Sequence, residues 1–323
     1  MIRVGYPASL HPRLFHDFPA GIELVPLPDG LDHDVEVEVW IPDPYPTRAL
    51  RIWPHLRGVR LILCLMAGTD WIPADAGPHI TISNARGAHS ISTAEWAVSA
   101  TLAMLKHFPL YLDLQRNADW RGRNRATVEY ERLTGSESGQ HPPVLVEELT
   151  GKQVLLVGHG SIGNTIEQML APFHVELIRV ARTARSEPLV HPVSTLDHLI
   201  PAAEVIILAL PLNDASRGLI GRRQFALMRQ GTLLVNAARG PVVDTDALVE
   251  ALKEGKIRAA LDVADPEPLP PDHPLWQCPN LLVTPHVAAS SPQFALRAMR
   301  IAAGELRRYL SGEPLCNAVQ LAG

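Results

Sequence analysis

The feature that most constrains this fold is a glycine-rich loop between a predicted strand and a predicted helix. The apolar run Val154–Val157 leads directly into Gly158-His159-Gly160-Ser161-Ile162-Gly163, and apolar residues at helical spacing follow. In such a loop the first glycine permits a tight turn, the second lets the backbone approach a pyrophosphate, and the third lets helix and strand pack closely. The start of the helix then presents free N–H groups to the anion. This context predicts a Rossmann-type dinucleotide site, and the alternative is a glycine-rich turn without a ligand.

His159 occupies the variable position between the first two glycines of this loop. A histidine in a ligand-binding loop can be interpreted as catalytic. Because the position is the variable one of the motif, the better interpretation is a side chain that simply faces solvent. We therefore expect His159 to be exposed.

Predicted strands and helices alternate from Gly151 onward. Near-continuous apolar runs are typical of parallel strands covered on both faces, and their alternation with helices predicts a doubly wound sheet. Residues 116–146 are polar, arginine-rich and weakly periodic, so we interpret them as a connector or an arm. The predicted strands are Ile2–Tyr6, Ile22–Val25, Val35–Trp40 (half-exposed), Leu61–Leu65, Val154–Val157, Val175–Val180, Val205–Leu210, Leu233–Asn236, Ala259–Val263 and Leu281–Thr284. The clearest predicted helices are Ser92–His107, Ile162–Leu170, Thr245–Glu254 and Pro292–Leu310.

The composition narrows the class of protein. A chain of 323 residues is long enough for about two domains. A net charge of −5 argues against a general nucleic-acid binder, which carries a basic excess. Three scattered cysteines without a Cys-x-x-Cys pair argue against a thiolate metal site and favour a reducing compartment. The longest apolar run is about eight residues, too short for a bilayer, and the N-terminal residues lack a signal core. We therefore expect a soluble cytoplasmic protein without metal, membrane or nucleic-acid partners.

The end of the second strand in the nucleotide-binding half indicates which dinucleotide is bound. An acidic residue there normally accepts the ribose hydroxyls of NAD, but this chain continues as Arg182-Thr183-Ala184-Arg185. An arginine at this point can bind a 2′-phosphate instead. We therefore expect Arg182, Thr183 and Arg185 to favour NADP(H), with NAD(H) as the second option. The alternative is that both arginines are merely solvated, since 25 of the 29 basic residues are arginines.

Three polar segments follow further predicted strands, at the carboxyl ends where open α/β sheets bind ligands. Arg239, Glu267 and His286 lie one in each segment. An arginine can hold the carboxylate and carbonyl of a 2-keto acid bidentately. A histidine can donate a proton near neutral pH, and a carboxylate bonded to the imidazole fixes its orientation. Each residue alone has an ordinary explanation as a loop-capping cation, a solvated charge or a core histidine. Their joint placement favours a hydride-transfer site.

These segments together resemble the D-isomer-specific 2-hydroxyacid dehydrogenase family, and the resemblance covers nearly the whole chain. The motifs that carry it are Gly158–Gly163, Asn236–Gly240, Asp262–Pro268, Asp272–Trp276 and Thr284–His286. The resemblance implies an α/β fold of two doubly wound parallel-sheet domains. In it, a Rossmann-type cofactor domain (98–287) is inserted into a smaller flavodoxin-like substrate domain (1–97 and 288–323). It also implies a homodimer, for which the polar arm is a candidate contact.

The resemblance implies roles for individual residues. Arg239 would bind the substrate and stabilise developing charge, His286 would contact the substrate as general acid and base, and Glu267 would pair with His286. Asp262 would contact the nicotinamide carboxamide. The run Ala67-Gly68-Thr69-Asp70 resembles the loop whose backbone N–H groups hold the substrate carboxylate, so Ala67 and Gly68 would bind substrate. The other residues expected to line the cofactor are Gly158, Gly160, Ser161, Ile162, Gly163, Leu210, Pro211 and Ala237.

The chain also departs from the family pattern. Ala264 stands where an aromatic is common, Met66 precedes the substrate loop, and Ala288–Ser291 replaces a glycine-containing run, all of which affect the shape of the pocket. Only 37 residues follow His286, too few for the regulatory domain of long phosphoglycerate dehydrogenases. Glu267 stands where formate dehydrogenases carry Gln, which argues against that activity.

We therefore expect an NADP(H)-dependent oxidoreductase that reduces a small 2-keto acid, glyoxylate or hydroxypyruvate, to the D-2-hydroxy acid. Two other classes remain open. A dinucleotide-sensing, co-repressor-like interaction protein would retain the same motifs with little turnover. A methyltransferase would use the glycine loop for S-adenosylmethionine, but it would leave Arg239 and His286 unexplained.

Overall fold

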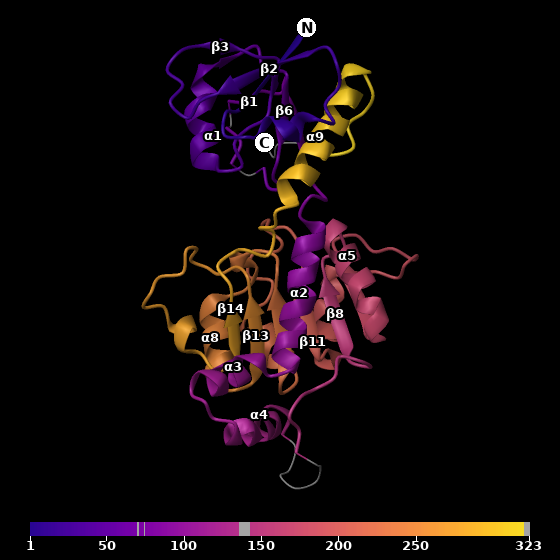
Figure 1. Ribbon diagram of the computed structural model, residues 1–323. Coiled ribbons are helices and arrows are strands. Elements are labelled where there is room, and N and C mark those ends of the chain that lie inside the picture. The colour runs from indigo at the N-terminus through magenta and orange to yellow at the C-terminus, as the bar shows by residue number, and fades with distance from the viewer. Residues whose placement is uncertain (70, 74, 136–142, 320–323) are drawn as a thin grey trace. The chain divides into compact units, whose positions relative to one another are not determined.

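The computed structural model describes residues 1–69, 71–73, 75–135 and 143–319. The chain forms two compact units (Figure 1). Unit 1 comprises Met1–His89 and the chain from Ser290 onward, and unit 2 comprises Ser90–Ala289. Unit 2 is thus inserted into unit 1 in the sequence. The boundary that we predicted after residue 97 falls inside one continuous helix, α2 (Ser90–Leu105), whose buried residues already belong to the core of unit 2.

Unit 1 is built on a six-stranded sheet with a helix on each face. Its strands are β1 (Ile2–Pro7), β2 (Ile22–Leu27), β4 (Val39–Trp40), β6 (Leu61–Cys64), β7 (Thr81–Asn84) and β15 (Ala318–Val319). They are ordered β15-β7-β6-β4-β1-β2 and are parallel except for β15. Without β15 this is the 2-1-3-4-5 order of flavodoxin-like folds.

The residues of β6 alternate between the two faces of this sheet, as the period of a strand requires. Leu61 and Leu63 share a core with α9 (Phe294–Leu310), whereas Ile62 and Cys64 share a core with α1 (Pro46–Ile52). Both faces of the central strands are therefore buried.

The prediction of a single half-exposed strand over residues 35–40 is wrong. The chain changes pairing partner within it: β3 (Val35–Glu36) pairs with β5 (Leu56–Arg57) in a small separate sheet, and β4 pairs with β1 in the main sheet. At the crossing point, Val37 N donates to Arg57 O (2.9 Å) and Glu38 N donates to Arg3 O (3.0 Å). The alternation of apolar and acidic residues continues through the crossing, so the sequence pattern does not reveal it.

Unit 2 is built on a seven-stranded, fully parallel sheet. Its strands are β8 (Gln153–Val157), β9 (Glu176–Ala181), β10 (His191–Pro192), β11 (Val205–Leu208), β12 (Thr232–Asn236), β13 (Ile257–Leu261) and β14 (Leu281–Val283). They are ordered β10-β9-β8-β11-β12-β13-β14. This is the 3-2-1-4-5-6 order of the Rossmann fold with one more strand at the edge. The predicted fold class, with two doubly wound parallel sheets, is confirmed.

Helices cover both faces of the sheet in unit 2 (Figure 1). One face packs against α2 and α5 (Ser161–Leu170). The other packs against α6 (Leu196–Leu199), α7 (Arg222–Leu227) and α8 (Thr245–Lys253). The four central strands β8, β11, β12 and β13 are almost completely buried, as their apolar runs predict.

The segment interpreted as a connector or arm is largely helical over its described part. It contains the end of α3 (Phe108–Arg116) and all of α4 (Arg125–Thr134). Ala126 and Leu133 of α4 are buried, and Gly231, in the turn before β12, approaches Leu133 O so closely that a Cβ would lie 2.7 Å from it. The sequence did not reveal α4 because this helix buries only two side chains, which is too weak a pattern to stand out. None of the helices described is both long enough and apolar enough to cross a lipid bilayer.

Candidate active site

The glycine loop lies between β8 and α5, as predicted. Gly158 N donates to Val180 O of β9 (2.8 Å). A Cβ at Gly163 would overlap the carbonyl oxygen of Gly158, so helix and loop can pack this closely only with glycine there. A Cβ at Gly160 would meet no atom within 4 Å, so the backbone is open at that point. Gly160 caps α5 without a side-chain hydrogen bond, which leaves the first helical N–H groups, including those of Ser161 and Ile162, available to an anion. These features fit a pyrophosphate.

The other residues predicted at the cofactor site lie at the same edge of the sheet. Leu210 and Pro211 follow β11, and Ala237 follows β12. Ala209 N donates to Val157 O (2.8 Å), and Ala237 N donates to Leu208 O (3.1 Å). Backbone bonds thus join the ends of β8, β11 and β12. The carboxyl ends of neighbouring parallel strands form the ligand edge of such a sheet.

The segment after β9 carries Arg182, Thr183 and Arg185, which are all exposed. The guanidinium of Arg185 lies against the glycine loop, where its NH2 group is 2.6 Å from His159 Nδ1 and donates to His159 O (3.1 Å). The expectation that His159 is exposed is wrong. Its side chain is only 4% exposed, because it lies between Arg185 and Glu167 of α5.

Arg239 follows β12 in a turn built by Asn236. The Asn236 side chain accepts from Ala238 N (3.0 Å) and donates to Arg239 O (3.1 Å). Arg239 itself is exposed, and its guanidinium donates to Ala238 O (2.8 Å). The next residue, Gly240, packs on the carbonyl of Ala264 so closely that a Cβ would overlap it. The turn that carries Arg239 therefore rests on the loop that leads to Glu267.

Glu267 and His286 form a pair, as the resemblance implies. His286 Nδ1 lies 2.5 Å from Glu267 Oε1, and each side chain is 43% exposed. Because an ionised carboxylate only accepts, Nδ1 carries a proton in this pair and Nε2 is the ring nitrogen left for another partner. His286 adopts the left-handed backbone region with φ of 53°, which is uncommon outside glycine.

Asp262, which follows β13 and is 3% exposed, holds the loop that carries His286. Its Oδ1 accepts from Thr284 Oγ1 (2.6 Å) and Val287 N (2.9 Å), and its Oδ2 accepts from Ala288 N (2.9 Å). Its main-chain carbonyl accepts from His286 N (2.7 Å). A carboxylate offers about four acceptor positions, so one remains on Oδ2. The nicotinamide contact predicted for Asp262 stays a prediction, and the sequence analysis missed both its role in the loop and that of Thr284.

The predicted substrate loop belongs to unit 1, where it follows β6. Ala67 O accepts from Asn84 Nδ2 (2.8 Å), and Gly68 comes next, while Asp70 lies outside the described residues. That Ala67 and Gly68 act together with Arg239 and His286 stays a prediction. Within the described residues, no group of three or more His, Cys, Asp or Glu side chains is arranged to hold a metal ion.

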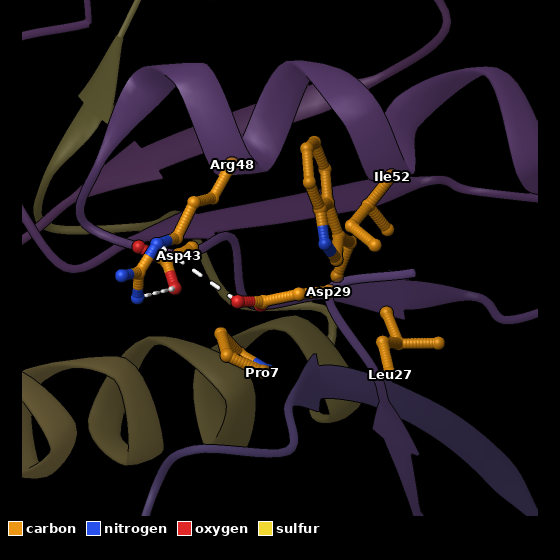
Figure 2. Close-up of a pocket in the computed structure, with 7 residues that line it drawn as sticks. Pro7, Leu27, Asp29, Asp43, Arg48 and Ile52 are labelled. Carbon is orange, nitrogen blue, oxygen red and sulfur yellow. Dashed lines mark ion pairs between the residues drawn. The ribbon is translucent and has the colours of Figure 1, made fainter. Parts of the chain in front are cut away.

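A small pocket in unit 1, shown in Figure 2, is a weaker candidate for a ligand site. It lies beside the carboxyl ends of β1, β2 and β4, and its charged groups are already engaged with one another. The Arg48 guanidinium lies between Asp43 (3.8 Å) and Asp29 (3.9 Å), and Asp43 also accepts from Tyr45 N (2.8 Å). These contacts explain the polar lining as local structure.

Comparison with known proteins gives a consistent result. Residues 98–288 match the family model described as D-isomer specific 2-hydroxyacid dehydrogenase, NAD binding domain. A glyoxylate reductase from Aeropyrum pernix is 31% identical over 262 residues, which cover 79% of this chain and 74% of that protein. A D-3-phosphoglycerate dehydrogenase from Archaeoglobus fulgidus is 32% identical over 260 residues, which cover 79% of this chain but only 46% of that protein. This chain therefore spans about half the length of that relative.

Among solved structures, a D-isomer specific 2-hydroxyacid dehydrogenase from Xanthobacter autotrophicus Py2, in complex with NADPH and MES, is similar over the whole chain. The identity is 26%, the match covers 99% of this chain and 98% of that one, and the TM-score is 0.75.

Proposed function

This chain belongs to the D-isomer-specific 2-hydroxyacid dehydrogenase family, and we propose that it uses NADP(H) to reduce a small 2-keto acid of the glyoxylate or hydroxypyruvate type to the D-2-hydroxy acid. The observation that carries the proposal is the His286–Glu267 pair (2.5 Å) beside the turn of Arg239. The similarity to a glyoxylate reductase supports the substrate class. The relatives named as phosphoglycerate dehydrogenases and formate dehydrogenases make it necessary to test that class directly.

The proposed chemistry assigns a different task to each residue. A nicotinamide cofactor bound at the glycine loop would supply the hydride for C2 of the keto acid. His286 holds on Nε2 the proton that the carbonyl oxygen takes, while Glu267 keeps the ring oriented through Nδ1. Arg239 binds the substrate carboxylate with its planar fork and stabilises the charge that develops on the oxygen.

The preference for NADP(H) rests on the segment after β9. No acidic residue stands at positions 182–186, directly after the strand, to accept ribose hydroxyls, and Arg182 and Arg185 are available to a 2′-phosphate. The similarity to a structure in complex with NADPH supports this preference. A hydrogen bond to a charged group contributes about 1.5–3 kcal/mol, which corresponds to a preference of about ten- to hundredfold.

A substrate panel tests this proposal. Glyoxylate, hydroxypyruvate, pyruvate and 3-phosphohydroxypyruvate are each supplied with NADPH and with NADH, and formate with NAD+ and NADP+, while the nicotinamide absorbance is followed. We expect turnover of one of the first two keto acids with NADPH. Turnover of the phosphorylated acid or formate alone would contradict the substrate class, and dinucleotide binding without turnover would favour a sensing protein.

Two variants test the assigned residues. His286→Ala should lower kcat about a hundredfold or more, as general acid–base contributions do. His198→Ala, an exposed histidine of α6, is the matched control and should retain full activity. Arg239→Lys should lower kcat/KM for the keto acid and leave NADPH binding nearly unchanged, because Lys lacks the bidentate fork. Equal losses for both ligands would instead place Arg239 at the cofactor.

We also propose a homodimer formed through unit 2. Trp120 is 85% exposed and Phe108 is 54% exposed, and both lie in the segment that contains α3 and α4. Exposed large apolar side chains mark contact surfaces when they gather in one region. Sedimentation of a monomer at micromolar concentration would contradict this assignment.

A further inference from the structure

A chain of polar contacts runs from α5 through the glycine loop to the segment after β9. Glu167 of α5 lies at its centre: Oε1 accepts from Arg179 NH2 of β9 (2.5 Å), and Oε2 lies 2.5 Å from His159 Nε2. On the other side of the imidazole, His159 Nδ1 lies 2.6 Å from Arg185 NH2. A nearly buried histidine of the glycine loop is thus in contact with one carboxylate and one guanidinium.

The chemistry of these groups determines the direction of each hydrogen bond. A guanidinium only donates and an ionised carboxylate only accepts. His159 must therefore accept at Nδ1 from Arg185 and donate from Nε2 to Glu167. The carboxylate is firmly ionised, since first Arg179 and then His159 lower the pKa of Glu167 to about 2. His159 is neutral in this arrangement, with one defined tautomer.

The contacts also fix Arg185 but not Arg182. The backbone of Arg185 exchanges two hydrogen bonds with Val190, at 3.1 and 2.9 Å. Its NH2 group is engaged with the ring and the carbonyl of His159, which leaves the hydrogens of Nε and NH1 for another acceptor. Arg182 is exposed, and no described residue forms a hydrogen bond or ion pair with its side chain. A guanidinium that is already ordered loses less conformational entropy when it binds an anion.

We propose that His159 is a positioning residue for cofactor choice: it holds Arg185 against the glycine loop, ready for the 2′-phosphate of an adenosine ribose. The inference rests on the proposed preference for NADP(H) and explains which arginine provides it. A dinucleotide on the glycine loop presents its ribose near the end of β9. Arg185 is the arginine of this segment that contacts the loop itself. His159 would then act through Arg185 and would not touch the phosphate.

The test uses two fragments that differ by one phosphate, adenosine 2′,5′-bisphosphate and AMP. Their dissociation constants are measured by calorimetry on the whole protein, so that no turnover is needed. We expect the parent to bind the bisphosphate about ten- to hundredfold more tightly than AMP. His159→Ala should reduce this ratio about three- to tenfold, as expected when one side chain must be ordered during binding. AMP binding should stay the same.

Further variants separate positioning from general damage to the loop. His159→Asn should preserve the ratio, because its side-chain carbonyl can accept from Arg185 much as Nδ1 does. His159→Met fills a similar volume without a strong acceptor, and it replaces His159→Ala should that variant not fold. In an Arg185→Ala background, His159→Met should change the ratio no further. His198→Ala is the control for loss of a histidine and should match the parent.

The outcomes distinguish this inference from the proposed function. A parent that prefers the bisphosphate and keeps that preference in both His159→Ala and His159→Met overturns the role of His159 alone. A parent with no preference overturns it together with the preference for NADP(H). A preference that depends on His159, in a protein that reduces none of the keto acids, supports this inference and contradicts the proposed reaction.

Discussion

Replacing Asp262 by Asn should loosen the loop that carries His286 while keeping the size of the side chain. In the parent, both carboxylate oxygens accept hydrogen bonds from this loop, from Thr284 and Val287 on Oδ1 and from Ala288 on Oδ2. The Asn carbonyl can keep the first two contacts. Its amide group then faces the N–H of Ala288, donor against donor, so that bond is lost.

The burial of Asp262 sets the size of the effect. The residue is 3% exposed, so water cannot replace the missing acceptor. A hydrogen bond to a charged group contributes about 1.5–3 kcal/mol, and each 1.4 kcal/mol is about a factor of ten in an equilibrium. Opening of the loop should therefore become about ten- to hundredfold more frequent in Asp262→Asn. Because His286 lies in this loop with an unfavourable φ of 53°, any loosening should also move its ring away from Glu267.

Amide hydrogen exchange measures this opening directly. We expect exchange at Ala288 to accelerate about ten- to hundredfold in Asp262→Asn, while the amides of β8 keep their parent rates. Thr284→Val is the matched comparison, because it removes one hydroxyl donor and leaves both backbone bonds to the Asp262 carboxylate, so Ala288 should change less. Parent-like exchange at Ala288 in Asp262→Asn would refute the assignment of Asp262 as the residue that holds the loop, whatever the enzyme activity.

Three further outcomes follow from other buried or charged groups. Arg258→Met should destabilise unit 2 by about 1.5–3 kcal/mol in urea unfolding, because the buried Glu147 loses a charged hydrogen-bond partner at 2.5 Å and keeps Lys152 at 3.3 Å. Adding Glu147→Leu removes the buried charge and should restore part of the loss. The pKa of Glu167 is lowered from 4.5 to about 2, so this carboxylate contributes stability that is complete above pH 4.5 and is lost as the pH falls through 2. Acid unfolding of Glu167→Gln should therefore depend less on pH in that window. An acid-unfolding profile identical to that of the parent would contradict this. Burial raises the pKa of the Cys64 thiol to about 12, so an aromatic disulfide reagent at pH 8 should modify the exposed Cys316 first and reach Cys64 only after unfolding.

The strands of unit 2 could be predicted because their signal is local. The four central strands are buried on both faces, so nearly every residue of β8, β11, β12 and β13 must be apolar or small. The glycine loop is equally local, since turn, open backbone and close packing all fall within six residues. Each of these elements could therefore be predicted from its own short segment of sequence.

The elements that were missed are short, and they are defined by how they pair with other strands. β7 is only four residues long, and it pairs with β6 on one side and with the distant β15 on the other. β10 has two residues and contains a proline, which is tolerated because it lies at the edge of the sheet. The switch between β3 and β4 occurs where the backbone carbonyl of Arg57 accepts from Val37 N and that of Arg3 accepts from Glu38 N. The spacing of apolar residues within a segment does not indicate which strand it pairs with.

In the candidate site, too, the residue types could be predicted from the sequence, but most of their contacts could not. That Glu267 and His286 lie together could be expected from the resemblance, and the 2.5 Å contact confirms that they do, although their catalytic roles stay predictions. The burial of His159 could not be expected, because its partners Glu167 and Arg185 lie 8 and 26 residues away on different elements. The residue types were all visible in the sequence, but the contacts depend on how α5 and β9 are placed.

One arrangement recurs at the ends of the neighbouring strands β12 and β13 and explains how the candidate residues are held. β12 ends at Asn236, whose amide builds the turn of Arg239. β13 is followed by Asp262, whose carboxylate accepts from two N–H groups of the loop of His286 and from the hydroxyl of Thr284, the residue after β14. In each case a polar side chain at a rigid strand end satisfies the backbone of the adjoining loop, so the half-exposed groups need no packing of their own. The chemistry can then lie on exposed loops and still be placed by the buried sheet.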